Sequence, residues 1–204
     1  VYGSVSRSFE TPTTTELANP NELGGFNAAL EPQRAEQFEL GLRHITDRQS
    51  LTVAAYQIDL EDELIPFELA AFPGRDFFEN SGASQRQGLE LAWKANGGSH
   101  WQTDLSYTFS DFVFDAFTTD DGENFSGNRI PGATRHQYFA QLRYSNEAGW
   151  FASVEAARVG AIDLNNANTA ATEPFTRVEL RLSRSFDVAN WKLAPFVAVS
   201  NALD

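Results

Sequence analysis

The stretch Thr176–Phe186, TRVELRLSRSF, decides the fold of this chain, because its side chains alternate in polarity with a period of two. Val178, Leu180 and Leu182 alternate with Arg177, Glu179 and Arg181. Successive side chains of a β-strand point to opposite faces of a sheet, whereas an amphipathic helix repeats its apolar positions every three to four residues. The stretch therefore predicts a strand with one apolar and one polar face.

The same alternation recurs along the chain and predicts about nine strands. They cover Val1–Phe9, Ala35–Ile45, Leu51–Leu69, Phe77–Ala95, Trp101–Phe117, Arg135–Ser145, Trp150–Asp163, Phe175–Asp187 and Trp191–Ser200. Several of them exceed the ~5–6 residues usual in soluble proteins. Long strands with one apolar face are typical of a sheet that crosses a membrane.

The connections between these strands alternate between short and long. The short ones are Thr46–Ser50, Asn96–His100, Asn146–Gly149 and Val188–Asn190, and the long ones are Glu10–Arg34, Ala70–Asp76, Thr118–Thr134 and Leu164–Pro174. Tight turns at one end and extended loops at the other are typical of an up-and-down transmembrane β-barrel. Aromatic residues near the short turns add an expected membrane-interface girdle: Trp93, Trp101, Tyr144, Trp150, Phe186 and Trp191.

Composition excludes several other classes. The 204 residues carry a formal net charge of −13, which argues against nucleic acid as a partner, and they include no cysteine. No run approaches the ~20 apolar residues of a membrane-spanning helix. We therefore expect an all-β, antiparallel up-and-down barrel, and its odd strand count makes it partial, because bacterial single-chain barrels have an even number of strands. A soluble β-rich ligand-binding module remains the alternative fold.

Five stretches, in this order, resemble the recurring barrel motifs of TonB-dependent outer-membrane receptors. They are Ser8–Leu17 (SFETPTTTEL), Leu30–Leu42 (LEPQRAEQFELGL), Asn80–Leu91 (NSGASQRQGLEL), Ile130–Gly132 (IPG) and Val199–Asp204 (VSNALD). The second carries Glu39-x-Gly41, with Gln33 in place of the usual Glu, and the third carries Gly88-x-Glu90. The last departs from the family at Ala202 and Leu203, where an aromatic residue is expected.

This resemblance implies that residues 1–204 are the C-terminal portion of a receptor barrel, about nine strands of a 22-stranded one, with the plug domain and final strand outside this chain. It implies energised uptake of a scarce solute across the Gram-negative outer membrane, most often a ferric siderophore or similar metal chelate. The expected partners are outer-membrane lipid, that small-molecule ligand and the TonB complex, reached through the plug. A passive outer-membrane porin is the alternative function.

Two groups of residues are candidates for contact with a solute. The alternation of side chains along each strand places one group on the inward, hydrated face: Glu39, Arg43, Arg86, Glu90, Arg143, Glu155, Arg177, Glu179 and Arg181. The same alternation, which we call parity, puts Asp104, Arg135 and Gln141 on that face. The second group joins arginine to aromatics in two long loops: Arg75, Phe77 and Phe78, then Phe125 and Arg129. Such pairs are suited to an anionic, aromatic chelate, through charge-assisted hydrogen bonds and stacking.

Nothing in the sequence favours catalysis. His44, His100 and His136 lack metal-ligand spacing, and no nucleophile elbow, phosphate loop or dinucleotide fingerprint occurs. We therefore expect neither an enzyme nor a resident metal or cofactor.

Overall fold

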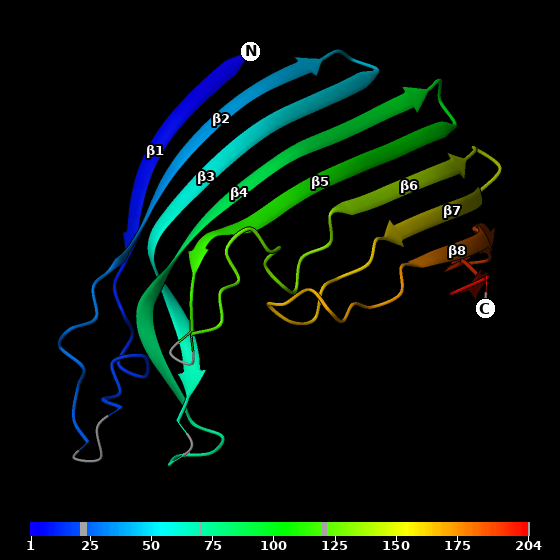
Figure 1. The fold of residues 1–204 in the computed structure, drawn as a ribbon. Helices are drawn as coiled ribbons and strands as arrows, with labels where there is room; N and C mark the ends of the chain where they lie inside the picture. The colour runs from blue at the N-terminus through cyan, green and yellow to red at the C-terminus, as the bar shows by residue number, and fades with distance from the viewer. Residues whose placement is uncertain (21–23, 70, 120–121, 204) are drawn as a thin grey trace.

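The computed structural model describes residues 1–20, 24–69, 71–119 and 122–203, and these form a curved antiparallel sheet (Figure 1). Its strands are β1 (Tyr2–Glu10), β2 (Gln33–Ile45), β3 (Gln49–Glu68), β4 (Asp76–Gly97), β5 (Trp101–Phe117), β6 (His136–Ser145), β7 (Trp150–Val159), β8 (Phe175–Arg184) and β11 (Phe196–Val199). They are hydrogen-bonded in chain order, β1 to β8 and then β11. In the described part of the chain, no helix is long and apolar enough to cross a membrane.

Short turns and long loops are segregated to opposite ends of the sheet, as the sequence predicts. Figure 1 shows the turns after β2, β4 and β6 at one end, and the long connections before β2, after β3, after β5 and after β7 at the other. Each antiparallel pair keeps a continuous register, apart from bulges where β3 and β4 run toward the loops. The sheet therefore has one compact end and one loop-rich end.

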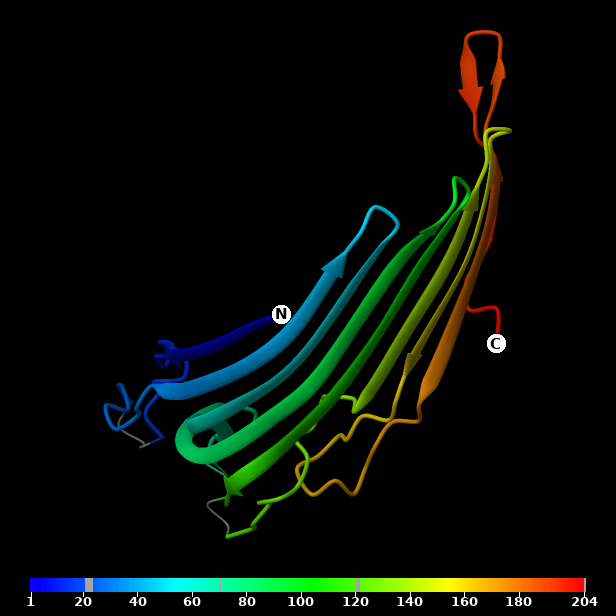
Figure 2. The ribbon, with the colours of Figure 1, turned by 90° about the horizontal axis from the view of Figure 1, so that it is seen from above.

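The last two predicted strands are wrong in their bounds. The stretch after β8 instead forms a separate hairpin of β9 (Phe186–Val188) and β10 (Trp191–Leu193), which projects beyond the neighbouring turns (Figure 2). Pro195 follows this hairpin and has no backbone N–H to donate, so the ladder with β8 resumes only at Phe196. β7 also ends earlier than predicted, at Val159, and the following Gly160 lies outside the strand.

The register separates the side chains into two faces. One face, which we call the apolar face, carries Leu40, Leu42, Val53, Leu89, Leu91, Leu105, Leu142, Val154, Leu180 and Leu182. Many of these side chains are exposed, including Leu40 at 63% and Leu182 at 49%. Large contiguous exposed apolar surfaces mark contact with a membrane or another protein. A water-soluble sheet would cover this face with a second layer, and no second sheet or helix of the described residues packs on it.

The strands differ in length from one side of the sheet to the other. β3 and β4 contain 20 and 22 residues, whereas β6, β7 and β8 contain 10 each. The additional residues of β3 and β4 extend the sheet toward the loop-rich end (Figure 1). Four apolar side chains are buried on β3, β4 and the neighbouring β5: Leu60, Phe77, Phe114 and Phe117.

Candidate functional site

The face opposite the apolar face, which we call the polar face, gathers the nine candidate inward residues. Register pairs connect them across the strands: Glu39, Arg43, Arg86, Glu90, Arg143, Glu155, Arg177, Glu179 and Arg181 all lie on this face. Asp104 and Gln141 share the face, as parity predicts. Two of the hollows in the surface are lined mainly by residues of this face, one over β2–β5 and one over β6–β8.

Ion pairs organise the charges of the polar face. Arg143 Nη2 lies 2.5 Å from Asp104 Oδ2, and Lys94 Nζ lies 3.8 Å from the other oxygen of the same carboxylate. Toward the loop-rich end, Arg86 Nη2 lies 2.5 Å from Glu63 Oε1, while the Ser84 hydroxyl donates to Glu63 Oε2 at 2.6 Å. These side chains come from adjacent strands, so the polar face presents mixed charge held by cross-strand contacts.

Tyrosine rings explain the two motif glycines of the polar face. Tyr2 lies opposite Gly41, and Tyr56 lies opposite Gly88, on the neighbouring strands. A Cβ atom added at either glycine would overlap the facing ring. Glycine at these positions therefore lets a tyrosine lie flat across the sheet. The motifs could be recognised from the sequence, but their facing tyrosines could not, because they lie 39 and 32 residues away along the chain.

Arg75, Phe77 and Phe78 lie where the loop after β3 leads into β4. The guanidinium carbon of Arg75 lies 5.0 Å from the centroid of the Phe77 ring, which is 1% exposed and packs against Phe72 at 5.7 Å between centroids. Phe78 is half-buried, whereas Arg75 is exposed. This corner therefore presents an accessible cation on an anchored aromatic base.

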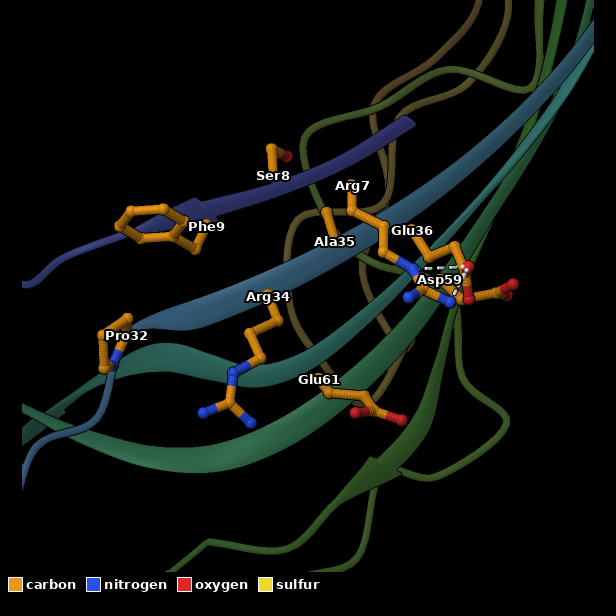
Figure 3. Close-up of a pocket in the computed structure, with 9 residues that line it drawn as sticks. All are labelled: Arg7, Ser8, Phe9, Pro32, Arg34, Ala35, Glu36, Asp59 and Glu61. Carbon is orange, nitrogen blue, oxygen red and sulfur yellow. Dashed lines mark hydrogen bonds and ion pairs between the residues drawn. The ribbon is translucent and has the colours of Figure 1, made fainter. Parts of the chain in front are cut away.

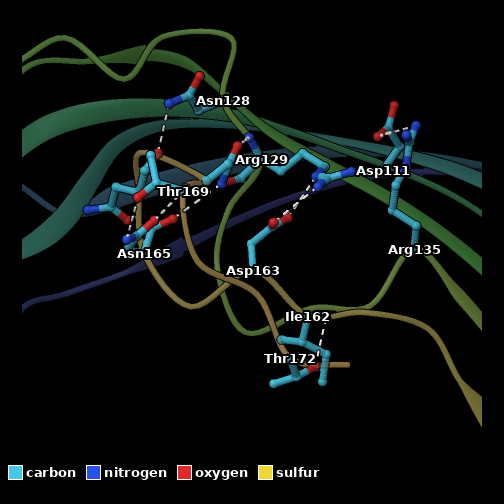
Figure 4. Close-up of polar contacts among 11 residues, drawn as sticks. Asp111, Asn128, Arg129, Arg135, Ile162, Asp163, Asn165, Thr169 and Thr172 are labelled. Carbon is cyan, nitrogen blue, oxygen red and sulfur yellow. Dashed lines mark hydrogen bonds and ion pairs between the residues drawn. The ribbon is translucent and has the colours of Figure 1, made fainter. Parts of the chain in front are cut away.

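Arg129 has a different environment, because its guanidinium is held by a carboxylate of the next long loop. Arg129 Nε donates to Asp163 Oδ2 at 2.7 Å and Nη2 donates to Oδ1 at 3.1 Å, and Asp163 is 6% exposed (Figure 4). The Arg129 backbone N–H and C=O both bond the side-chain amide of Asn168. Asn128 donates to the carbonyl of Asn166 at 2.8 Å. We call this set of contacts the loop clamp.

The structure thus gives different environments to the two arginine–aromatic groups, which the sequence presents as equivalent candidates for binding a solute. Phe125 packs on Phe117 at 5.6 Å between centroids, next to the loop clamp. The loop clamp occupies Arg129 with a structural contact, so Arg75 is the better candidate to meet an anion. Sequence reasoning missed Asp163, whose partner lies 34 residues earlier in another loop.

Breaking the loop clamp is expected to free both loops. In Arg129→Ala, the backbone amides of residues 128–130, 132 and 162–169 should exchange hydrogen about tenfold faster, because a charge-assisted hydrogen-bond pair of roughly 1.5 kcal/mol is lost. Hydrogen exchange with mass spectrometry measures this. Asp163→Ala should give the same increase, and the double variant no further one. Additive effects of the two substitutions would contradict a direct pair.

Arg135 departs from its predicted face. It precedes β6, and its Nη2 lies 2.9 Å from Asp111 Oδ1, while its guanidinium carbon lies 5.7 Å from the Phe109 ring centroid. Phe109 pairs with His136 and Leu89, which belong to the apolar face. Parity fails here because Arg135 lies just outside the strand, where alternation no longer fixes the direction of a side chain.

Charged residues border the apolar face at its loop-rich end. Figure 3 shows one corner of this border, where Arg7 and Arg34 lie among Glu36, Asp59 and Glu61 around a hollow in the surface. Arg7 Nη2 lies 2.8 Å from Glu36 Oε1. At the opposite border, near the short turns, Trp101 packs on Tyr144 at 4.8 Å and Arg184 lies 5.1 Å over the Trp150 ring. The apolar face is thus a band between two polar or aromatic borders.

Within the described residues, no group of three or more His, Asp or Glu side chains is arranged to hold a metal ion. The chemistry available in the described residues is that of charged and aromatic side chains on a sheet and its loops.

Comparisons with known proteins match this architecture. The family model for "TonB dependent receptor-like, beta-barrel" matches residues 1–201. Among solved structures, the siderophore receptor PiuA from Acinetobacter baumannii aligns with a TM-score of 0.76 at 17% identity, over 99% of this chain and 29% of that one. The copper transporter OprC aligns with a TM-score of 0.73 at 16% identity, over 98% and 30%.

The ferric-catecholate import receptor Fiu from Escherichia coli K12 aligns with a TM-score of 0.71 at 20% identity, over 99% of this chain and 29% of that one. The chain spans only part of the solved structures that it resembles, from 27% of one to 33% of another. The open sheet is therefore part of a barrel wall. The antiparallel register, the segregated turns and the match over residues 1–201 show that the chain belongs to the TonB-dependent receptor-like β-barrel family.

Proposed function

We propose that this chain forms part of the wall and loops of an outer-membrane receptor that imports a scarce solute, a ferric siderophore or similar metal chelate. Receptors of this family are transporters and not enzymes, and the family implies the Gram-negative outer membrane. The observation that carries the proposal is the division of one sheet into an exposed apolar face and a charged polar face. Lipid on one side and water on the other account for both faces.

On this proposal, the polar face lines a hydrated lumen and the loop-rich end faces the medium outside the cell. The charged residues of the polar face then contact the plug domain or the passing solute, while the loops meet the solute first. The TonB complex supplies energy through the plug. The cargo class rests on the siderophore receptors among the similar structures, and OprC extends it to other metals.

Arg75 is proposed to bind the solute, because it presents a cation over the buried Phe77 ring at the loop-rich end. Arg75→Ala should weaken binding of a ferric catecholate by about tenfold, the loss expected for a charge-assisted hydrogen bond with a cation–π contribution. Fluorescence quenching of the purified receptor measures the dissociation constant. Arg48→Ala, an exposed arginine in a short turn at the other end, is the control and should bind normally. Equal affinity in both variants would remove Arg75 from the site.

Deletion of the gene that encodes this receptor tests the function itself. Uptake of radioactive iron is measured with a panel of ferric siderophores in iron-depleted medium, with and without a functional TonB complex. The proposal expects at least one siderophore whose uptake requires both the receptor and the TonB complex. Uptake that needs the receptor but not the TonB complex would indicate the passive porin instead.

Extraction distinguishes the remaining alternative, a soluble ligand-binding module. A barrel wall with its apolar face in lipid stays with the membrane until detergent is added, whereas a soluble module appears in the aqueous fraction. The exposed leucines of the apolar face favour the membrane.

A further inference from the structure

A cluster of cations and aromatic rings lies at the loop-rich border of the apolar face, over β5–β7. We call it the cationic patch, and it consists of Tyr107, Phe109, Arg135, His136, Tyr138 and Arg158. Register pairs Tyr107 with Tyr138, and Tyr138 with Arg158, on the apolar face. Arg135, His136 and Arg158 are all exposed. The patch therefore begins where the leucines of the apolar face end.

Contacts among the rings hold the patch in place. The Tyr107 and Tyr138 ring centroids lie 4.9 Å apart, and the Tyr107 hydroxyl is 3.0 Å from His136 Nδ1. Arg135 lies over the Phe109 ring and pairs with Asp111 (Figure 4). Arg158 Nη1 donates to the Thr176 hydroxyl at 3.0 Å. Thr176 is neutral, and no carboxylate of the described residues forms an ion pair with Arg158, so this guanidinium retains donors for an anion.

Among the described residues, the net charge of this border is positive over β5–β7. Toward β1–β4 the same border also carries two arginines, Arg7 and Arg34, but the three carboxylates of Glu36, Asp59 and Glu61 outnumber them. Gln57, Gln85 and Gln87 lie beside them, and their side-chain amides bond Asp59 or one another. In the patch itself, Asp111 offsets one of the two arginines. An anion that approaches the apolar face from the side therefore finds its complementary charge beside Arg158 and Arg135.

We propose that the cationic patch binds the phosphate groups of a membrane lipid in the leaflet on the loop-rich side. This rests on the proposed function, which places the apolar face in the bilayer. An acyl chain of the lipid would lie along the leucines of the apolar face, while the lipid's phosphate reaches the border, where arginine donors match phosphate oxygens. Tyrosine rings are suited to this depth, since their apolar body and polar hydroxyl meet the two media.

The test uses the full-length receptor, stripped of lipid in a neutral detergent and titrated with bisphosphorylated lipid A. Native mass spectrometry counts the bound lipid. Arg158→Gln should weaken binding about tenfold, as expected for loss of a charge-assisted hydrogen bond to phosphate. Arg184→Gln removes another arginine near the apolar face, at the short-turn border, and should leave binding unchanged. Dephosphorylated lipid A should bind the unaltered receptor as weakly as lipid A binds the Arg158→Gln variant.

The possible outcomes separate the patch from the membrane assignment. Equal binding of both lipids to all variants would overturn the patch while leaving the apolar face in lipid. Binding of neither lipid to any variant would overturn the membrane placement as well. Displacement of lipid A by millimolar inorganic phosphate would show a site for free phosphate, which also contradicts the lipid proposal.

Discussion

Replacing Leu180 by arginine is expected to lower the free energy of unfolding of the membrane-embedded receptor by about 2–4 kcal/mol, the cost of an arginine facing lipid near the bilayer midplane. Leu180 is 41% exposed and pairs with Val154 on one side and Val199 on the other. Leu180 and its paired residues lie between the aromatic border near Trp150 and the loop-rich border near Arg158. Urea titration of the receptor in phospholipid vesicles, followed by tryptophan fluorescence, measures the change.

The neighbouring residue provides the matched control. Glu179 points to the polar face, where Arg177 Nε lies 3.1 Å from its carboxylate and both side chains are about half exposed. Glu179→Gln removes one exposed ion pair and should change the unfolding free energy by less than about 1 kcal/mol. Similar losses in Leu180→Arg and Glu179→Gln would mean that the two faces do not meet different media, and the assignment of lipid and lumen would have to be withdrawn.

Replacing Gly149 by alanine is expected to cost about 2–5 kcal/mol of folding stability. Gly149 ends the turn between β6 and β7 with a φ of +81°, and an added Cβ would overlap the backbone carbonyl oxygen of Ser185. The left-handed backbone costs an alanine ~1–2 kcal/mol, and the overlap with a backbone atom adds ~1–3 kcal/mol. The backbone N–H of Ser185 also donates to the Gly149 carbonyl oxygen at 2.8 Å, so a shift of Ser185 that relieves the overlap would strain this hydrogen bond.

Gly98 separates the two contributions. It lies in the turn between β4 and β5 with a φ of +72°, but no atom lies within 4 Å of its added Cβ. Gly98→Ala should therefore cost only the backbone contribution of about 1–2 kcal/mol. Urea titration of both variants in the same vesicles gives the difference. Equal costs would show that Ser185 moves away freely, and that the junction between β8 and β9 is looser than its contacts indicate.

The strands and their order could be predicted from the sequence because each is encoded locally. Alternation around Leu180 and the polar residues of the short turns both act within a few positions of the chain. The break between β10 and β11 was missed because Leu193–Val199 (LAPFVAV) is a continuous apolar run, in which no change of polarity marks the end of a strand. Pro195 lies within this run and cannot donate a ladder hydrogen bond.

The candidate site was less predictable, because it depends on residues that are distant in sequence. Parity placed Glu39 and Arg181 on one face, since a strand fixes the direction of each side chain. In the loops, direction is set by partners: Asp163 holds Arg129, and Asp111 draws Arg135 away from the polar face. The sequence shows motif residues such as Gly88 but not the reason for them, which is that the ring of Tyr56 occupies the space of a Cβ atom.

The unequal strand lengths bear on the motion of the loop-rich end. β3 and β4 stay paired, apart from a bulge near Glu63, well past the level at which β6–β8 end, so the two strands separate there only if many backbone hydrogen bonds break. Over β6–β8, the backbone beyond the strands is joined by isolated bridges and the Arg129–Asp163 pair. Within this part of the wall, thermal fluctuations of the loop-rich end are therefore expected to be larger over β6–β8 than over β3 and β4.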